Sequence, residues 1–373
     1  MKKRVGITGS KGFLAFHLLL RLQIDFKEEI EIIPFQRSFI DDAINLDRFT
    51  KNCDTIIHLA AINRHSDHNY LLNRNIEITR RIIESLERVN FQGDLVYVSS
   101  SQENEDNNYG KSKKYCRRLL EQFYNLSNGK LYILKPCNIF GAFVSPNYNS
   151  VFATFCYNLN HGIPCEIVND KSVKFIYVDN VINSITEVIK NSIEGVSEVK
   201  FDFEIKVSEL LKTLTYLYQK ILKNEIPPLD SHNDLNIYNT LRSYIDFREF
   251  YPRQLICHSD TRGDFFEILR SDSSGQFSFS TTNPGVTRGN HFHTRKVERF
   301  IVIQGKALIE LFSLRTKDKI KFIVEGTNPA FIEIPIYHSH RITNIGNDTL
   351  LTAFWINEHY NPNNPDTILY EFD

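Results

Sequence analysis

The stretch "VGITGSKGFLA", residues 5–15, decides the fold that we expect for the first part of this chain. A short apolar strand runs into a glycine-containing turn, and a helical stretch follows at once. In this context the turn can cradle a pyrophosphate at the N-terminus of the helix. Gly9 and Gly12 suit the tight turn, and Ala15 is small enough for the helix to lie close to the strand. The residues expected along a dinucleotide are Thr8, Gly9, Ser10, Lys11, Gly12, Phe13 and Leu14.

Beyond this turn, short apolar strands alternate with helical stretches as far as "DLVYVSS", residues 94–100. The alternation predicts a Rossmann-type α/β fold, a doubly wound parallel sheet with helices on both faces. From about Phe247 the pattern changes to alternating strands separated by Gly, Asn and Pro turns, which indicates an antiparallel sandwich or small barrel. We place the boundary near residue 245, with a dinucleotide-binding domain over 1–245 and an all-β domain over 246–373.

Composition narrows the class of protein. The 373 residues carry a net charge of −1, so no overall field favours nucleic acid or an anionic membrane. The six cysteines are scattered, which is typical of reduced thiols in the cytoplasm. The chain has no apolar run of membrane-spanning length and no signal-peptide core at its start. We therefore expect a soluble, cytoplasmic protein that binds neither nucleic acid nor membrane.

The segment "PFQRS", residues 34–38, bears on cofactor choice. It ends the second expected strand, where an NAD-selective site places a carboxylate on the ribose hydroxyls. Arg37 is instead a good partner for a 2′-phosphate, so NADP(H) is favoured over NAD.

The segment "YGKSK", residues 109–113, carries the strongest catalytic signal in the first part. Tyr109 and Lys113 lie one helical turn apart on the same face, and the ammonium can lower the pKa of the phenol toward the working pH. The tyrosine can then donate a proton to a carbonyl. Just upstream, Ser100 or Ser101 ends a strand at the ligand-binding edge of the sheet and can hydrogen-bond the substrate oxygen.

Together these segments resemble the extended short-chain dehydrogenase/reductase superfamily, whose members act on nucleotide sugars. The resemblance rests on "TGSKGF" (8–13), "DTIIHLAA" (54–61), "NIEITR" (75–80), "SSS" (99–101), "YGKSK" and "KPCNIFG" (135–141). It implies cofactor contacts for Leu59, Ala60, Ala61 and Asn75, and a substrate contact for Asn138. Lys135 replaces the family's usual arginine.

The second part carries metal-ligand side chains in "NPGVTRGNHFHTRKVERFIVIQG", residues 283–305. His291 and His293 are two apart on an expected strand and share a face. With Glu298 and His340 they form a ligand set suited to Zn²⁺ or another divalent transition metal. The spacing from Gly285 to Gly305 resembles the first sequence motif of the cupins, and this resemblance implies a double-stranded β-helix, or jelly-roll, domain. The second cupin motif is only partly present, because Tyr337 occupies its usual glycine position. His338, two before a ligand, is an alternative ligand or a catalytic acid/base.

The whole chain resembles the bifunctional capsular-polysaccharide-synthesis reductase/epimerase family (the CapF family). The additional matching segments are "PNYNSVFATFCYNL", "RGDFFEIL" and "NPNNPDT". The resemblance implies a UDP-linked 2-acetamido-2,6-dideoxy-hexos-4-ulose on the path to UDP-N-acetyl-L-fucosamine. The cupin would epimerise C3 and the reductase domain would then reduce the C4 ketone with NADPH. His338, Tyr337 and Lys296 are candidates for the cupin base, and the metal is either catalytic or structural.

Other functions stay open at this point. One is a single-step nucleotide-sugar 4-ketoreductase whose cupin serves only to dimerise. Another is a 4,6-dehydratase or 4-epimerase, although "SSSQEN" (99–104) lacks the acidic residue that dehydratases place after the catalytic hydroxyl. A third is a non-catalytic redox-sensing binding protein, against which the Tyr109 and Lys113 pair argues. We expect a homodimer, because sandwiches of this type commonly pair.

Overall fold

The computed structural model describes residues 1–191 and 195–373. It divides into two compact units, each built from more than one stretch of the chain. The first unit comprises Met1–Phe140, Val144–Val151 and Lys171–Lys206, and the second comprises Gly141–Phe143, Phe152–Asp170 and Val207–Asp373. The division differs from a single cut near residue 245, because the helices within residues 152–170 and 207–242 belong to the same unit as the all-β part.

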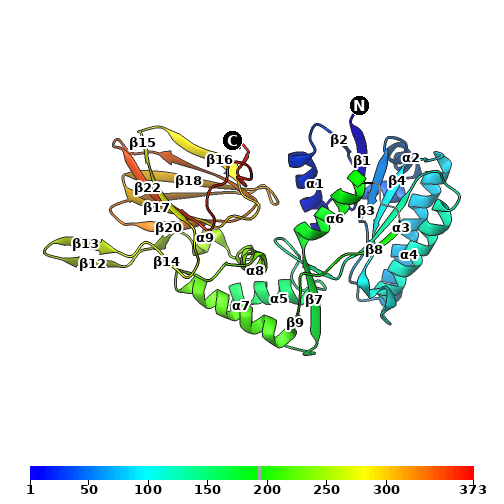
Figure 1. Cartoon of the computed structure of the whole chain (residues 1–373), viewed down its shortest axis with the longest axis horizontal. Helices are drawn as coiled ribbons and strands as arrows, with labels where there is room; N and C mark the ends of the chain where they lie inside the picture. The colour runs from blue at the N-terminus through cyan, green and yellow to red at the C-terminus, as the bar shows by residue number, and fades with distance from the viewer. Residues whose placement is uncertain (192–194) are drawn as a thin grey trace. The chain divides into compact units, whose positions relative to one another are not determined.

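The first unit is a doubly wound α/β fold. Its main sheet has the order β2-β1-β3-β4-β5-β8, and all neighbouring strands are parallel. Helices α1 and α6 lie on one face, and α2, α3 and α4 lie on the other (Figure 1). The elements of the main sheet and its helices are β1 (Lys3–Thr8), α1 (Phe13–Asp25), β2 (Ile30–Ile33), η1 (Arg37–Asp41), α2 (Ala43–Lys51), β3 (Thr55–His58), α3 (His68–Arg88), β4 (Asp94–Val98), η2 (Ser101–Asn104), α4 (Asn108–Tyr124), β5 (Leu131–Lys135), α6 (Val178–Asn191) and β8 (Gly195–Glu198). A smaller sheet contains β6 (Asn138–Phe140), β7 (Ser172–Tyr177) and β9 (Phe203–Lys206).

The apolar strands of the main sheet form the core of this unit. Ile56, Leu95 and Ile133 on adjacent strands pack against Ile82 of α3 and Leu120 of α4, and none of them is more than 2% exposed. Strands buried on both faces read as nearly continuous apolar runs, which is why the parallel sheet is visible in the sequence. The predicted Rossmann-type fold is confirmed.

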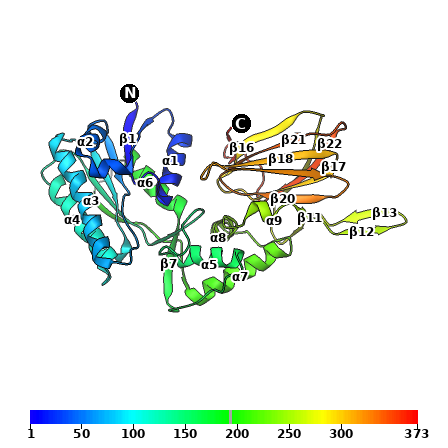
Figure 2. The same cartoon turned by 180° about the vertical axis from the view of Figure 1, so that it is seen from behind.

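The second unit is an antiparallel two-sheet sandwich with helices attached (Figure 2). One sheet has the order β11-β20-β17-β22-β15 and the other β19-β18-β21-β16-β23. The helices are α5 (Val151–Asn160), α7 (Val207–Leu222), α8 (His232–Arg242) and α9 (Phe247–Phe250). The strands of the sandwich are β11 (Arg253–Gln254), β15 (Gln276–Thr282), β16 (Thr287–Phe292), β17 (Glu298–Gln304), β18 (Lys306–Ser313), β19 (Lys319–Glu325), β20 (Ala330–Ile334), β21 (His338–Asn344), β22 (Leu350–Ile356) and β23 (Ile368–Leu369). A separate hairpin consists of β12 (Cys257–Asp260) and β13 (Gly263–Phe266), and β10 (Glu225–Ile226) pairs with β14 (Arg270–Ser271).

Two further sequence expectations can be compared with the structure. No disulfide joins the six cysteines, of which Cys53, Cys116 and Cys156 are buried and Cys257 is exposed. No helix within residues 1–191 and 195–373 combines the length and the apolar character that crossing a membrane requires.

A buried ion cluster joins the helices of the second unit to its sandwich. Glu333 of β20 accepts a hydrogen bond from Arg299 Nε at 3.1 Å and lies 3.2 Å from Arg242 Nε at the end of α8. All three side chains are buried. Burial alone would raise the pKa of Glu333, but the two guanidinium groups outweigh it and lower the pKa. The carboxylate therefore stays charged, and its two partners fix α8 against the sheet.

We predict that Glu333→Ala lowers the free energy of unfolding of the second unit by about 3 to 5 kcal/mol, because it leaves two buried cations without their anion. The single tryptophan, Trp355, lies opposite Arg299 on β22, so its fluorescence reports urea unfolding of this unit. The matched control is Glu325→Gln, which removes an ion pair with Lys306 whose side chains are 47% and 45% exposed. If Glu333→Ala and Glu325→Gln unfold at the same urea concentration, the cluster of Glu333, Arg299 and Arg242 has no structural role.

Candidate functional site

The glycine turn of the first unit lies directly against the loop that follows β3. Gly9 has a φ of +71°, and a Cβ atom there would lie 2.9 Å from the backbone nitrogen of Ala60. Gly12 closes the turn by donating its N–H to Gly9 O at 2.8 Å. Thr8 Oγ1 accepts hydrogen bonds from the N–H groups of Leu59 and Ala60, both at 3.2 Å. The structure thus brings the two predicted cofactor segments together at the carboxyl edge of the sheet.

Other predicted cofactor residues surround this turn. Lys11 is exposed at its tip, and Phe13 and Leu14 begin α1. Ser10 Oγ donates to Phe35 O at 2.9 Å, which connects the turn to the segment after β2. Arg37 is exposed two residues further on, as the first residue of η1.

Asn75 acts through neighbouring protein groups. Its side chain is buried, and its amide accepts from Ile62 N at 2.7 Å and donates to Ile62 O at 2.9 Å. It also donates to Ser112 Oγ at 3.1 Å, and this hydroxyl donates to Tyr109 O at 2.7 Å. Asn75 therefore holds the loop that follows Ala61 against the helix that carries Tyr109.

Tyr109 and Lys113 lie on α4, as predicted from their spacing. The Lys113 ammonium is 5.9 Å from the centre of the Tyr109 ring and donates to Val98 O at 2.8 Å. Burial lowers the pKa of Lys113 to about 8. The expectation that Lys113 lowers the pKa of the phenol does not hold here, because burial first, and then Tyr148, raise the pKa of Tyr109.

The serine loop is held next to the start of α4. Gly110 allows this approach, because a Cβ atom there would lie 1.9 Å from Gln102 O. Asn107 caps the helix by accepting from Gly110 N at 2.7 Å. Ser100 is almost buried and accepts from Gln102 N at 3.2 Å, whereas Ser101 is exposed at the start of η2.

A buried carboxylate that the sequence did not reveal supports this loop. Glu103 accepts from Ser99 Oγ and from Arg117 Nε, the latter at 3.0 Å, and it lies 3.2 Å from Lys135 Nζ. Burial raises its pKa, but Ser99, Lys135 and Arg117 together lower it. Lys135, which replaces the family's usual arginine, thus pairs with Glu103. Asn138 is exposed at the start of β6 and donates to Lys174 O at 3.1 Å.

The predicted metal ligands of the second unit form one cluster. One potential ligand atom from each of His291, His293, Glu298 and His340 can be chosen so that all lie within 4.8 Å of one another. His291 is near the end of β16, His293 follows that strand, Glu298 begins β17 and His340 is in β21. His338 is two residues before His340 on the same strand, and its Nδ1 lies 3.0 Å from Ile336 O. The structure therefore brings the four predicted side chains together, although His293 lies just beyond the strand on which we expected it together with His291.

The hydrogen-bonding pattern of the cluster suits a divalent cation. His293 Nδ1 hydrogen-bonds Asp366 O, and because a carbonyl only accepts, this nitrogen carries the proton. His293 Nε2 hydrogen-bonds Glu298 Oε2 at 3.0 Å, and when His293 is neutral the lone pair of the ring lies on this nitrogen. His340 Nε2 is buried 3.3 Å from the same oxygen without a hydrogen bond of normal geometry. Lone pairs that converge in this way need a proton or a cation between them.

The charges in the cluster favour a proton or a cation between these groups. Burial lowers the pKa of His293, but the hydrogen bond to Glu298 outweighs burial and raises this pKa. Burial raises the pKa of Glu298, but His293 and His340 outweigh burial and lower it, so the carboxylate is ionised. Burial, with help from His340 and His293, lowers the pKa of His291 to about 4. His291 is therefore neutral near pH 7 and offers a lone pair.

Comparison with known proteins agrees with both halves of this description. A family model described as the NAD dependent epimerase/dehydratase family matches residues 5–201, and one described as the polysaccharide biosynthesis C-terminal domain matches residues 258–368. The chain belongs to the NAD dependent epimerase/dehydratase family. Within it, the chain is a fusion of the CapF type, in which an all-β domain follows the nucleotide-binding fold.

Individual relatives cover nearly the whole chain. A UDP-2-acetamido-2,6-beta-L-arabino-hexul-4-ose reductase from Pseudomonas aeruginosa is 32% identical over 368 residues, which are 98% of this chain and 97% of that protein. The crystal structure of the capsular polysaccharide assembling protein CapF from Staphylococcus aureus is 30% identical, with a TM-score of 0.62 and coverage of 99% of this chain and 100% of that one. A structure of RMD from Pseudomonas aeruginosa complexed with NADPH is 21% identical, with a TM-score of 0.52, and covers 58% of this chain and 83% of that one. The last likeness concerns the fold alone.

Proposed function

We propose that this chain converts a UDP-linked 2-acetamido-2,6-dideoxy-hexos-4-ulose in two steps, C3 epimerisation in the second unit followed by NADPH-dependent reduction of the C4 ketone in the first. The product is a precursor of UDP-N-acetyl-L-fucosamine for capsule or O-antigen. The observation that carries the proposal is the presence of two separate reactive groupings, the Tyr109 and Lys113 pair and the His₃Glu cluster, in a chain of this family. The full-length relative is itself described as a reductase of such a 4-keto sugar nucleotide.

In the reduction, the nicotinamide cofactor supplies a hydride when it is bound. Tyr109 holds the proton that the C4 oxygen must receive, and the charged Lys113 stabilises the phenolate left behind. Ser100 or Ser101 orients the carbonyl oxygen. Glu103 holds the loop that carries these serines in place through its contacts with Ser99 and Lys135. Because the pKa of Lys113 is about 8, its charge is present at neutral pH and is lost as the pH rises through this value.

The epimerisation follows from the same ketone. The hydrogen at C3 is α to the C4 carbonyl, so a base can remove it, and return of a proton to the opposite face inverts the centre. A divalent cation held by His291, His293, Glu298 and His340, for which we propose Zn²⁺, would stabilise the negative charge on the carbonyl oxygen. We propose His338 as the acid/base, since it shares a strand face with His340 and its Nδ1 contact leaves Nε2 to accept a proton. Tyr337 and Lys296 are the alternatives.

Two variants separate the steps. Tyr109→Phe removes the phenolic proton and should lower the rate of NADPH oxidation by about a hundredfold or more, with C3 exchange unchanged. Tyr115→Phe is its control, because Tyr115 is an exposed tyrosine on the same helix.

His340→Ala should abolish metal binding and C3 exchange but still allow reduction of substrate supplied already epimerised.

The measurements are deuterium incorporation at C3 from heavy water without NADPH, and NADPH oxidation with pre-epimerised substrate. Near-normal NADPH oxidation by Tyr109→Phe would refute the reductase assignment. Undiminished C3 exchange in metal-free His340→Ala would show that the cluster is dispensable for epimerisation. Complete absence of C3 exchange in the unmodified protein would leave a single-step reductase with a structural sandwich.

We propose that Arg37 selects NADPH by contacting the 2′-phosphate. Its position two residues beyond Phe35, which the glycine turn contacts, supports this role. Arg37→Ala should weaken NADPH binding by about 1.5 to 3 kcal/mol, the range for a hydrogen bond to a charged group, and should spare NADH. Fluorescence titration with both cofactors measures the difference. Equal losses for NADPH and NADH would contradict the selective role.

We also propose that the chain forms a homodimer through β15. This strand lies at an edge of its sheet, and Phe277 and Phe279 on it are 51% and 72% exposed. A second copy related by a twofold axis would cover these rings and the open strand edge at once. Light scattering should give twice the mass of the chain, and Phe279→Ser should shift the mass toward that of one chain. A monomeric unmodified protein would refute the proposal.

A further inference from the structure

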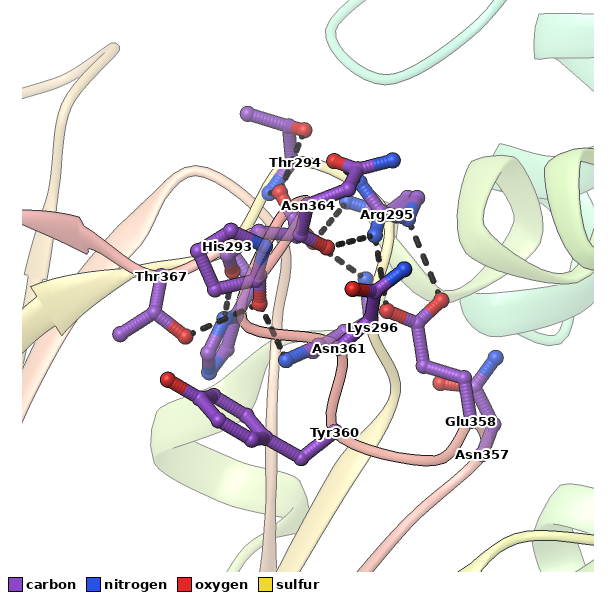
Figure 3. A network of polar contacts seen from close by, with 12 residues as sticks. His293, Thr294, Arg295, Lys296, Asn357, Glu358, Tyr360, Asn361, Asn364 and Thr367 are labelled. Atoms are coloured by element: carbon purple, nitrogen blue, oxygen red, sulfur yellow. Dashed lines mark hydrogen bonds and ion pairs between the residues drawn. The ribbon is translucent and has the colours of Figure 1, made fainter.

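The segment "NPNNPDT", residues 361–367, is used by neither proposed reaction. It follows β22 and lies against residues 293–296, which leave the strand that carries His291 (Figure 3). Asp366 within it is 6% exposed. A carboxylate this far from water requires partners, and their identity shows what the segment does.

The carboxylate of Asp366 is fully occupied by the loop after His293. One oxygen accepts from Thr294 N at 2.9 Å and from Thr294 Oγ1 at 2.7 Å. The other accepts from Arg295 N and Lys296 N, both at 3.0 Å. Successive backbone N–H groups that converge on one anion form a rigid concave turn. The direction of residues 294–296 is therefore set by one side chain.

The backbone of the same residue contacts a metal-ligand candidate. Asp366 O accepts the Nδ1 proton of His293, so Nε2 is the nitrogen that faces Glu298, and it hydrogen-bonds Glu298 Oε2 at 3.0 Å. Histidines that bind metal ions commonly have such a partner on the other ring nitrogen, which fixes the tautomer and the ring orientation. Asp366 has a φ of +41°, in the left-handed region, which Asp tolerates better than most residues. At this φ its carbonyl contacts His293 while its side chain contacts residues 294–296.

Two further contacts fasten the segment. Arg295 donates to Glu358 at 2.9 and 3.1 Å and to Asn364 O at 2.9 Å. Lys296 Nζ donates to Pro365 O. Figure 3 shows Arg295 and Lys296 between Glu358 on one side and Asn364 on the other. The turn around Asp366 is thus held in place independently of the histidine cluster.

We propose that Asp366 is a positioning residue for the metal centre, which holds His293 in the tautomer and orientation that bind the ion. The inference rests on the proposed function in taking the His₃Glu cluster to be a metal site. Asp366 does not touch the ion itself. It orients the His293 ring through Nδ1, the nitrogen that does not face the ion, and it fixes residues 294–296, which follow His293.

The test measures metal affinity in the full chain with Zn²⁺ as the probe, by competition with a chromophoric chelator. Asp366→Gly keeps a backbone that accepts positive φ and removes all four carboxylate contacts. Zn²⁺ affinity should fall by about 10- to 100-fold, the usual loss when the partner of a ligating histidine is disturbed. The matched control is Asp348→Asn, an exposed carboxylate on another turn of the same unit, which should bind Zn²⁺ as the unmodified protein does.

A second variant and a spectrum separate positioning from folding. Asp366→Asn keeps the shape and places one amide N–H₂ against backbone N–H groups, so its affinity should be intermediate. The visible spectrum of Co²⁺-loaded protein should change in Asp366→Gly, because a rotated His293 alters the ligand geometry. Asp366→Gly should lower the urea midpoint of the metal-free protein, because it leaves the N–H groups of residues 294–296 without their acceptor, so its Zn²⁺ affinity is measured without denaturant, where the variant is folded.

The outcomes are distinct. Failure of the unmodified protein to bind Zn²⁺ would refute the metal site and this inference together. Zn²⁺ binding by Asp366→Gly with unmodified affinity and an unchanged Co²⁺ spectrum would overturn the inference alone. If Asp366→Gly fails to fold, unmodified affinity in folded Asp366→Asn would overturn it equally.

Discussion

Both units are organised around charged side chains that have been removed from water. An isolated ion in a protein interior costs several kcal/mol, so every such group must meet partners, and these partners come from elsewhere in the chain. Glu103 meets Lys135 and Arg117 from the next strand and helix, and Glu333 meets Arg242 from a helix that precedes the sandwich. These pairings decide which segments must lie together. The Glu333 cluster in particular holds α8, which precedes residue 245, in one compact unit with the β-sheets of the sandwich.

The buried charged groups differ in how many hydrogen-bond and ion-pair partners they have. This difference distinguishes groups that hold the fold together from groups that can bind a ligand. Asp366 has four donors for two oxygens, and such a network is rigid and has no capacity left for a ligand. The His₃Glu cluster is incomplete by contrast, since His340 Nε2 is within ion-pair distance of Glu298 but makes no hydrogen bond of normal geometry. Lys113 has Val98 O as its hydrogen-bond acceptor, while burial weakens its hold on the proton. Buried polar groups that still lack a hydrogen-bond or ion-pair partner are the ones to which a cation or a substrate can bind.

Some of the site residues that the sequence predicted are close together in the chain, whereas His340 and residues 59–61 were expected only from the resemblance to known families. Gly9 and Gly12, Tyr109 and Lys113, and His291 with His293 and Glu298 are close in the chain, so local geometry alone places them together. Glu103 and Asp366 could not be found in this way, because their partners are separated from them by long stretches of unrelated sequence. The pKa of Tyr109 was misjudged for a related reason. Spacing gave the distance of its ammonium partner, but burial in the folded unit, and after it Tyr148, raised the pKa of Tyr109.

In the proposed function, the order of the two reactions follows from the chemistry of the ketone. Inversion at C3 requires the C4 carbonyl, because only an adjacent carbonyl makes that hydrogen removable. Reduction consumes the carbonyl and so stops further exchange at C3. A reversible epimerisation in the second unit would then be drawn forward by reduction in the first. The two groupings need different environments, a buried ammonium beside a phenol for one and converging lone pairs for the other, and a fusion of two folds in one chain supplies both in equal number.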